Sequence, residues 1–423
     1  MSGSVNRMAK WCRRVALLCL YLFVLFLPLY EAPKNIFGFL FLAFGIISII
    51  LEFLQNRSVK IERPPYFILL FILLFFLTFF SGLGTNYLSS DQRFWSAFNW
   101  ASMLLVCITY FSLKINEVET ILIIRILCFS LVLGIFDAFW SWEGEYPQIN
   151  SVGHVNQSAL YASIVAISSF FLFVFERVNK INLSLFLVTI IMSGLYLAYS
   201  KSLVALGLFF TGLGGFLFIW LGIQKRRKEI VFLCVGVILI GVSLSKVPVK
   251  YFGVFEPVMD EFHQRLANDR GKGFSNRDLL FNSAIEVAAD SVFGFGLGSF
   301  GEATTKKRLK KRVEGRGGNW KLEKNNYFSS SHGHNLFSNM LVERGWLGVV
   351  AMLGFLIGLG VYFIRNARRS RFALYGSFFL LLVCLAGFGQ SVFHVEHGQV
   401  AFLVLIMLCQ SIHNKFESEV GDT

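Results

Sequence analysis

The chain has 423 residues, of which 55% are hydrophobic and only 15% are charged, and its mean hydropathy is +0.62. A soluble domain needs more charge on its surface, so this composition excludes an ordinary soluble protein and indicates a polytopic membrane protein. The net charge of +13 does not indicate nucleic-acid binding, because the excess lies in loops beside apolar runs, where basic residues orient helices and contact anionic lipids.

Apolar runs long enough to cross a bilayer recur along the chain. At roughly 20 residues per crossing they predict an all-α protein with about twelve transmembrane helices. The runs lie near residues 15–30, 35–54, 66–83, 96–113, 119–140, 156–175, 181–199, 202–223, 229–246, 346–364, 372–393 and 398–413. The first run follows a basic segment but has no small-residue cleavage site after it, so we expect a retained helix rather than a signal peptide.

Basic residues predict how these helices are oriented. If the N-terminus is cytoplasmic, Arg and Lys concentrate in the cytoplasmic loops, for example Lys225–Lys228 and Arg365–Arg371, and the opposite short loops carry few. This asymmetry follows the positive-inside rule and places both termini in the cytoplasm.

One long loop, residues 247–335, interrupts the pattern of short connections and falls on the side opposite the cytoplasm. It divides the chain into helices 1–9 (residues 1–246), the loop, and helices 10–12 with the C-terminus (residues 336–423). Within the loop, Leu279, Leu280, Ser283 and Val287 are at helical spacing, which predicts a helix over Asn276–Ala289. Loops of this length are often functional.

The end of this loop, Ser329–Gly348, holds the strongest candidate for chemistry. His334 could act as a general base, since imidazole titrates near neutral pH, or could satisfy polar groups at the start of the following helix. His332 would support it or be solvated. Asn335 is expected to cap the helix, and Glu343 could pair with a cation of the site.

Two cations on the same side could bind a phosphate group. Arg277 opens the predicted loop helix, and its guanidinium has the donor geometry that phosphate oxygens need. Lys201 lies in the Ser200–Ser202 break between two apolar runs, where it could meet an anionic head group or extend to the interface. Asn156 and Gln157, at the start of another run, could cap that helix or bind sugar hydroxyls.

Several common chemistries are not indicated. The seven cysteines fall in or beside apolar segments, without a metal-binding spacing. The chain contains no nucleotide-binding GxxxxGK[ST] loop and no GxSxG elbow. We therefore expect no metal and no cofactor.

Four pieces of sequence together resemble the O-antigen ligase and polymerase superfamily. They are Gly153-x-x-Asn156-Gln157, the Ser-Lys-Ser turn at 200–202, the Arg277 helix leading into Gly294-x-Gly-x-Gly298-x-Phe300, and His332-Gly-His334-Asn335 with Glu343-x-Gly345-x-x-Gly348. The resemblance covers most of the chain in architecture and mainly residues 150–365 in sequence. The family usually has an arginine where this chain has Lys201, which keeps the charge but loses the bidentate fork.

The resemblance implies a GT-C-like glycosyltransferase of the bacterial inner membrane, with its active site facing the periplasm. Such an enzyme transfers an O-antigen glycan from undecaprenyl pyrophosphate to a sugar of lipid A–core, without metal or ATP and with inversion. His334 would be the base, and Arg277 and Lys201 would bind the pyrophosphate, with His332, Asn335, Glu343, Asn156 and Gln157 in supporting roles.

Three alternatives remain. Within the family, an O-antigen polymerase or a protein O-oligosaccharyltransferase would carry the same histidine motif. A lipid-linked glycan transporter is the alternative of another class. It would predict charges at mid-membrane, broken helices and an internal repeat, and only Arg125 and Asp137 support it.

Overall fold

The computed structural model describes residues 2–56, 73–74, 109–110, 113, 115–143, 147–149, 155–175, 180–200, 202–223, 275–296, 298–304, 335–389 and 399–421. These residues form helices, turns and irregular segments, and none of them forms a strand. Seven helices within these ranges are long and apolar enough to cross a membrane. The chain is therefore a multi-pass α-helical membrane protein by helix length and hydropathy, as its composition predicts.

The seven helices match predicted runs. They are α2 (Glu31–Asn56), α5 (Glu117–Trp140), α6 (Val155–Phe175), α7 (Lys180–Ser200), α8 (Leu203–Ile223), α15 (Leu336–Asn366) and α16 (Arg371–Gly389). Helix α1 spans Ser2–Phe26, and α17 spans Gln399–Gly421 with a shorter apolar stretch at Val400–Ile412. The predicted runs 66–83, 96–113 and 229–246 lie essentially outside the described residues.

The described helices belong to two compact units. One, called here the α6 unit, comprises residues 16–41 and 116–267, and the other, the α15 unit, comprises residues 1–15, 42–115 and 268–423.

In the α6 unit, α6 packs against α5, α7 and α8. Its hydroxyl side chains bond to the backbone of its neighbours. The Ser163 Oγ donates to the carbonyl of Ala205 at 2.8 Å, and the Ser169 Oγ donates to the carbonyl of Phe186 at 3.3 Å. Because no water reaches these groups inside a bilayer, such bonds satisfy the hydroxyls and join the helices.

Aromatic rings gather near the ends of α5 and α7 in the same unit. The ring of Tyr199 stands edge-on to those of Phe139 and Trp142, with both centroid separations at 5.6 Å, and the Tyr196 hydroxyl donates to the carbonyl of Pro147 at 3.0 Å. Aromatic side chains with a polar edge concentrate where a membrane meets water. The position of this cluster agrees with α5 and α7 ending at the membrane surface.

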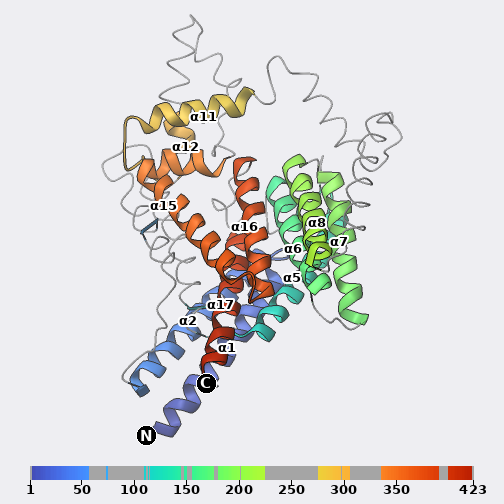
Figure 1. Ribbon diagram of the computed structural model, residues 1–423, viewed down its shortest axis with the longest axis vertical. Coiled ribbons are helices and arrows are strands. Elements are labelled where there is room, and N and C mark those ends of the chain that lie inside the picture. Colours follow the sequence, from blue (N-terminus) through green and yellow to red (C-terminus); the bar gives the residue numbers. More distant parts are fainter. Residues whose placement is uncertain are drawn as a thin grey trace, which may run out of the picture. The chain divides into compact units, whose positions relative to one another are not determined.

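In the α15 unit, α16 packs against both α15 and α17 (Figure 1). Two further helices, α11 (Ser275–Ala288) and α12 (Phe300–Thr304), pack on α15. The helix predicted at Asn276–Ala289 is thus confirmed as α11, one residue earlier at each end.

Helix α15 is broken near its start. Gly345 has φ 67° and ψ −167°, which no helix contains, so a short first segment, Leu336–Arg344, precedes a straight one that begins at Trp346. The straight segment rises about 1.5 Å per residue and is about 30 Å long, enough to cross the hydrocarbon core by itself. The predicted run began at 346 because the first segment carries Glu343 and Arg344 and does not look like a membrane span.

Candidate functional site

The structure describes the predicted site residues unequally. Asn335, Glu343, Asn156 and Gln157 are described, and Arg277 is described only by its backbone, in the first turn of α11. The predicted residues Lys201, His332 and His334 lie outside the described residues. The described segments on either side of these residues form the site's support.

Asn335 caps the first segment of α15. Its backbone is extended, and its Oδ1 accepts from the backbone N–H of Phe337 at 2.8 Å and of Ser338 at 3.2 Å. Its Nδ2 donates to the carbonyl of Phe388, near the end of α16, at 3.1 Å. The expected capping role is confirmed. The residue directly after position 334 is therefore fixed to two helices at once.

The glycine-rich segment 294–298 packs on the break in α15. The N–H groups of Phe295 and Gly296 donate to the carbonyls of Val342 and Glu343, both at 3.0 Å. A helix break leaves the last carbonyls before it without helical donors, and these two bonds supply donors from the neighbouring chain. The Glu343 carboxylate then extends the contact, since its Oε1 accepts from the N–H of Gly298 at 2.9 Å.

Glu343 therefore has a described partner that differs from the expected cation. It is fully buried, and its charge-assisted bond to a backbone N–H is the stronger class of hydrogen bond. Its nearest neighbour in sequence, Arg344, is also fully buried, and the Arg344 Nη1 contacts the Met340 sulfur. Glu343 thus holds the 294–298 segment, and the buried Arg344 guanidinium also interacts electrostatically with the Glu343 carboxylate. The pairing of Glu343 with a cation of the proposed site stays a prediction.

Glycine is required where the two segments meet. Gly294 has φ +79°, and a Cβ there would overlap the backbone of Glu343 and Arg344. A Cβ on Gly345 would overlap the carbonyl group of Val292 and approach the Gly294 nitrogen to 2.7 Å. Both residues also have positive φ, which side chains disfavour. The two sequence patterns, 294–298 and 343–345, are thus the two sides of one backbone contact.

Gly348 completes the pattern for a different reason. A Cβ on Gly348 would overlap the Cβ of Arg344 and lie 3.4 Å from its Cγ. Because Gly348 has no side chain, the buried side chain of Arg344 has room beside it. Arg344 was not singled out from the sequence, and the signal for it was the pair of glycines at one and four residues beyond it.

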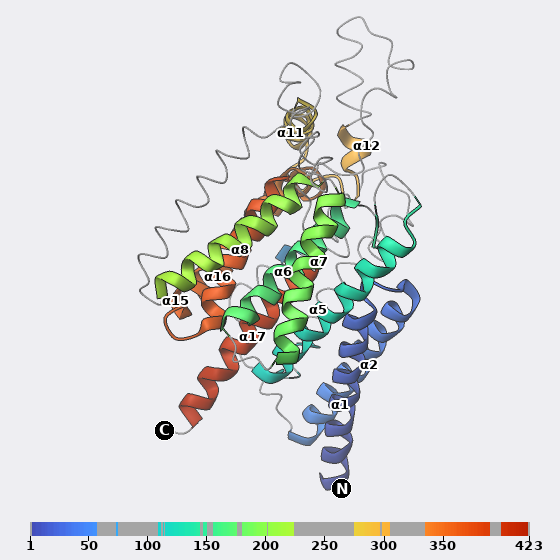
Figure 2. The same ribbon diagram turned by 90° about the vertical axis from the view of Figure 1, so that its right-hand side faces the viewer.

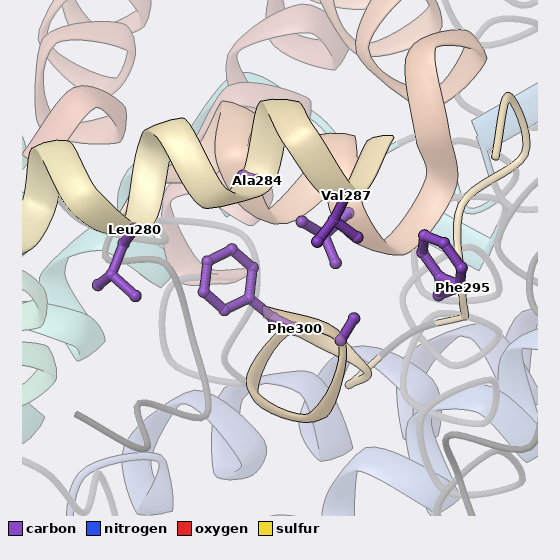
Figure 3. Close-up of a cluster of buried hydrophobic side chains, with 7 residues drawn as sticks. Leu280, Ala284, Val287, Phe295 and Phe300 are labelled. Carbon is purple, nitrogen blue, oxygen red and sulfur yellow. The ribbon is translucent and has the colours of Figure 1, made fainter. Parts of the chain in front are cut away.

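A hydrophobic cluster joins α11 to this contact. Figure 3 shows Leu280, Ala284 and Val287 of α11 facing Phe300 of α12 and Phe295 of the glycine-rich segment. Val342 of α15 and Ala303 of α12 complete the cluster, and all seven side chains are buried. Burying one such side chain contributes about 1.5–3 kcal/mol. The helix that carries Arg277 is therefore held on the same scaffold as the cap residue next to position 334.

Asn156 and Gln157 belong to the α6 unit. Helix α6 begins at Val155, so both residues lie inside its first turn, and both are half-buried. The expectation that Asn156 caps the helix is wrong, because a cap precedes the first helical residue.

Among the described residues, no three His, Cys, Asp or Glu side chains lie close enough to hold a metal ion.

No protein-family model matches the chain, and the comparison with curated proteins finds no match either.

Proposed function

We propose that the protein is an inverting, metal-independent glycosyltransferase that moves an O-antigen glycan from undecaprenyl pyrophosphate to a sugar of lipid A–core. One observation carries the proposal. The glycine-rich segment 294–298 and the Glu343–Gly345 break, which the resemblance pairs with His334 and Arg277, form a single buried contact. The cap residue Asn335 and the Arg277 helix are both attached to it.

The chemistry requires few groups from the protein. The acceptor hydroxyl oxygen attacks the anomeric carbon of the donor, the bond from that carbon to the phosphate oxygen breaks, and undecaprenyl pyrophosphate leaves with the electron pair. His334 takes the hydroxyl proton, and Arg277 and Lys201 neutralise the charge that develops on the pyrophosphate. Because the attack comes from the face opposite the leaving group, the anomeric configuration inverts.

A rigid support for these residues would contribute much of the rate. Positioning two reactants can account for several kcal/mol of a barrier, and a small displacement of a catalytic group removes much of that gain. Residue 334 directly precedes Asn335, whose side chain makes three hydrogen bonds to α15 and α16. In this proposal, Asn335 keeps His334 correctly positioned relative to the acceptor hydroxyl.

The break in α15 does not favour a transporter. Transporters place broken helices and charges near the middle of the membrane, whereas Gly345 precedes a straight segment that can span the core alone. Arg125 and Asp137 both lie in α5 and are half-buried. Twelve residues separate them, about 18 Å along the helix, so they do not form a pair.

The decisive experiment is reconstitution of the purified protein with defined undecaprenyl-pyrophosphate glycan. Lipid A–core, a second molecule of donor, and an acceptor peptide are supplied in separate reactions, and products are identified by mass spectrometry. A glycan joined to lipid A–core supports the proposal. Joining two donors indicates a polymerase, and a glycopeptide indicates a protein glycosyltransferase. Movement of the donor across the bilayer without formation of a new glycosidic bond would refute the proposed glycosyltransferase activity and indicate a transporter.

A further inference from the structure

An apolar surface remains exposed on the α15 unit, outside the straight segment of α15. It comprises Phe281 and Ile285 of α11 and Val292 and Phe293 of the turn after it, with 42%, 40%, 55% and 60% of their surfaces exposed. Phe281 and Ile285 are neighbours one turn apart, and Val292 and Phe293 are adjacent in the chain. Scattered apolar residues on a surface are ordinary, but a concentration of exposed apolar side chains marks a contact surface. This group is called here the α11 apolar edge.

Helix α11 has more apolar surface than its own unit covers. Leu280, Ala284 and Val287 face the buried cluster, and Phe281 and Ile285 lie one turn apart beside them. Asn282, also exposed, lies about 100° around the helix from Phe281. The helix therefore has a buried apolar side, an exposed apolar side and a polar side.

The α11 apolar edge ends beside the start of the straight segment of α15. The turn at Val292 lies against the break at Gly345, because the Val292 carbonyl occupies the space that a Cβ on Gly345 would need. Directly after the break come Trp346, Leu347 and Val350, with 48%, 40% and 63% exposure. These begin the straight segment that is long enough to cross the membrane core, and a tryptophan at such a start is typical of the interface.

The direction of α11 fits a position in the plane of the membrane. In Figure 1, α11 lies crosswise to the long part of α15, and Figure 2 views α11 nearly end-on. A helix running across the end of a membrane span lies close to parallel to the membrane surface.

We propose that the α11 apolar edge is inserted into the adjacent leaflet of the bilayer, with Phe281, Ile285, Val292 and Phe293 in contact with lipid acyl chains. The occupant of this surface is lipid, because Val292 lies against Gly345 and the exposed apolar residues Trp346, Leu347 and Val350 follow that contact on a helix long enough to cross a membrane. The insertion does not depend on the reaction that the protein catalyses. If it transfers glycans, the insertion keeps the Arg277 helix at the depth of a lipid-linked pyrophosphate.

Photo-crosslinking to lipid tests the proposal. The residue p-benzoylphenylalanine replaces Phe281 or Phe293 in the full chain, reconstituted in vesicles of phosphatidylethanolamine and phosphatidylglycerol. Asn282 is the matched control, since it is exposed on the same turn of the same helix. Val350, inside the straight segment of α15, is the positive control for contact with lipid.

We expect lipid adducts at positions 281 and 293 in yields close to that at 350 and several-fold above that at 282, measured by mass spectrometry of the intact protein. Equal yields at 281 and 282 would overturn the proposal. So would adducts at 281 and 293 that join two segments of one chain, or two copies of the chain, in place of lipid. Variants that elute as monodisperse protein before reconstitution exclude misfolding as the cause of either result.

Discussion

Replacing Gly345 by alanine tests the contact that supports the site. The residue has φ 67° and ψ −167°, and strain of this kind costs about 1–3 kcal/mol for a residue with a side chain. The added Cβ also overlaps the Val292 carbonyl group. The 292–298 segment must therefore move away from α15.

Movement of that segment breaks two backbone hydrogen bonds, from Phe295 to Val342 and from Gly296 to Glu343. Each contributes about 0.5–1.5 kcal/mol net, so the whole contact should weaken by about 2–6 kcal/mol once strain is included. At about 1.4 kcal/mol per tenfold change, a loss of about 4 kcal/mol corresponds to about a thousandfold change in an opening equilibrium.

Amide hydrogen exchange measures that equilibrium directly. In Gly345→Ala reconstituted in nanodiscs, the amides of Phe295, Gly296 and Gly298 should exchange faster by a factor of the order of a thousand. Gly360→Ala is the matched control on the same helix. A Cβ at Gly360 meets only the Leu380 Cδ2, at an ordinary 3.6 Å, and alanine favours a helix. Unchanged exchange at 295–298 in Gly345→Ala, as in the control, would refute this account of the contact.

The remaining predictions concern the proposed chemistry and its support. His334→Ala should abolish glycan transfer while the protein inserts and purifies normally, and full activity in that variant would exclude the general base. Arg277→Ala should impair use of the lipid-linked donor, with partial recovery in Arg277→Lys, which keeps the charge without the fork; equal activity of the two variants would contradict phosphate binding by the guanidinium. Asn335→Ala should lower the stability of the α15 start by about 1 kcal/mol, seen as faster amide exchange of Phe337 and Ser338. Addition of EDTA to the transfer assay should leave the rate unchanged, and a loss restored by a divalent cation would contradict the metal-independent reaction.

The sequence predicted α11 and the straight segment of α15 because both follow from the pattern of neighbouring residues. The helical spacing of Leu280, Ser283 and Val287 predicted α11 to within one residue, and hydropathy predicted the straight segment of α15 from its first residue. In both cases one short stretch of chain contains the whole signal, because periodicity and apolar length are properties of neighbouring residues.

What escaped prediction depends on residues far apart in the chain. Glu343 was expected to meet a cation, and its hydrogen bond to the N–H of Gly298 was not predicted. The contact between segments 294–298 and 343–345 could not be predicted from their residue types, because every residue except proline has a backbone N–H donor. The glycines at 294 and 345 showed only that some close approach or unusual backbone was needed at each place. The break in α15 was missed for the related reason that Leu336–Arg344 is too polar for a membrane run and too short to stand out as a helix.

The contact between Glu343 and Gly298 also sets an order of events during synthesis. Its two residues are 45 positions apart, so the glycine-rich segment leaves the ribosome well before the carboxylate that will hold it. Until then α11 and the segment after it lack their partner, and the three donors of Phe295, Gly296 and Gly298 must be solvated. The contact therefore closes only after translation has passed Gly345, which makes the first segment of α15 a prerequisite for fixing α11 and the glycine-rich segment.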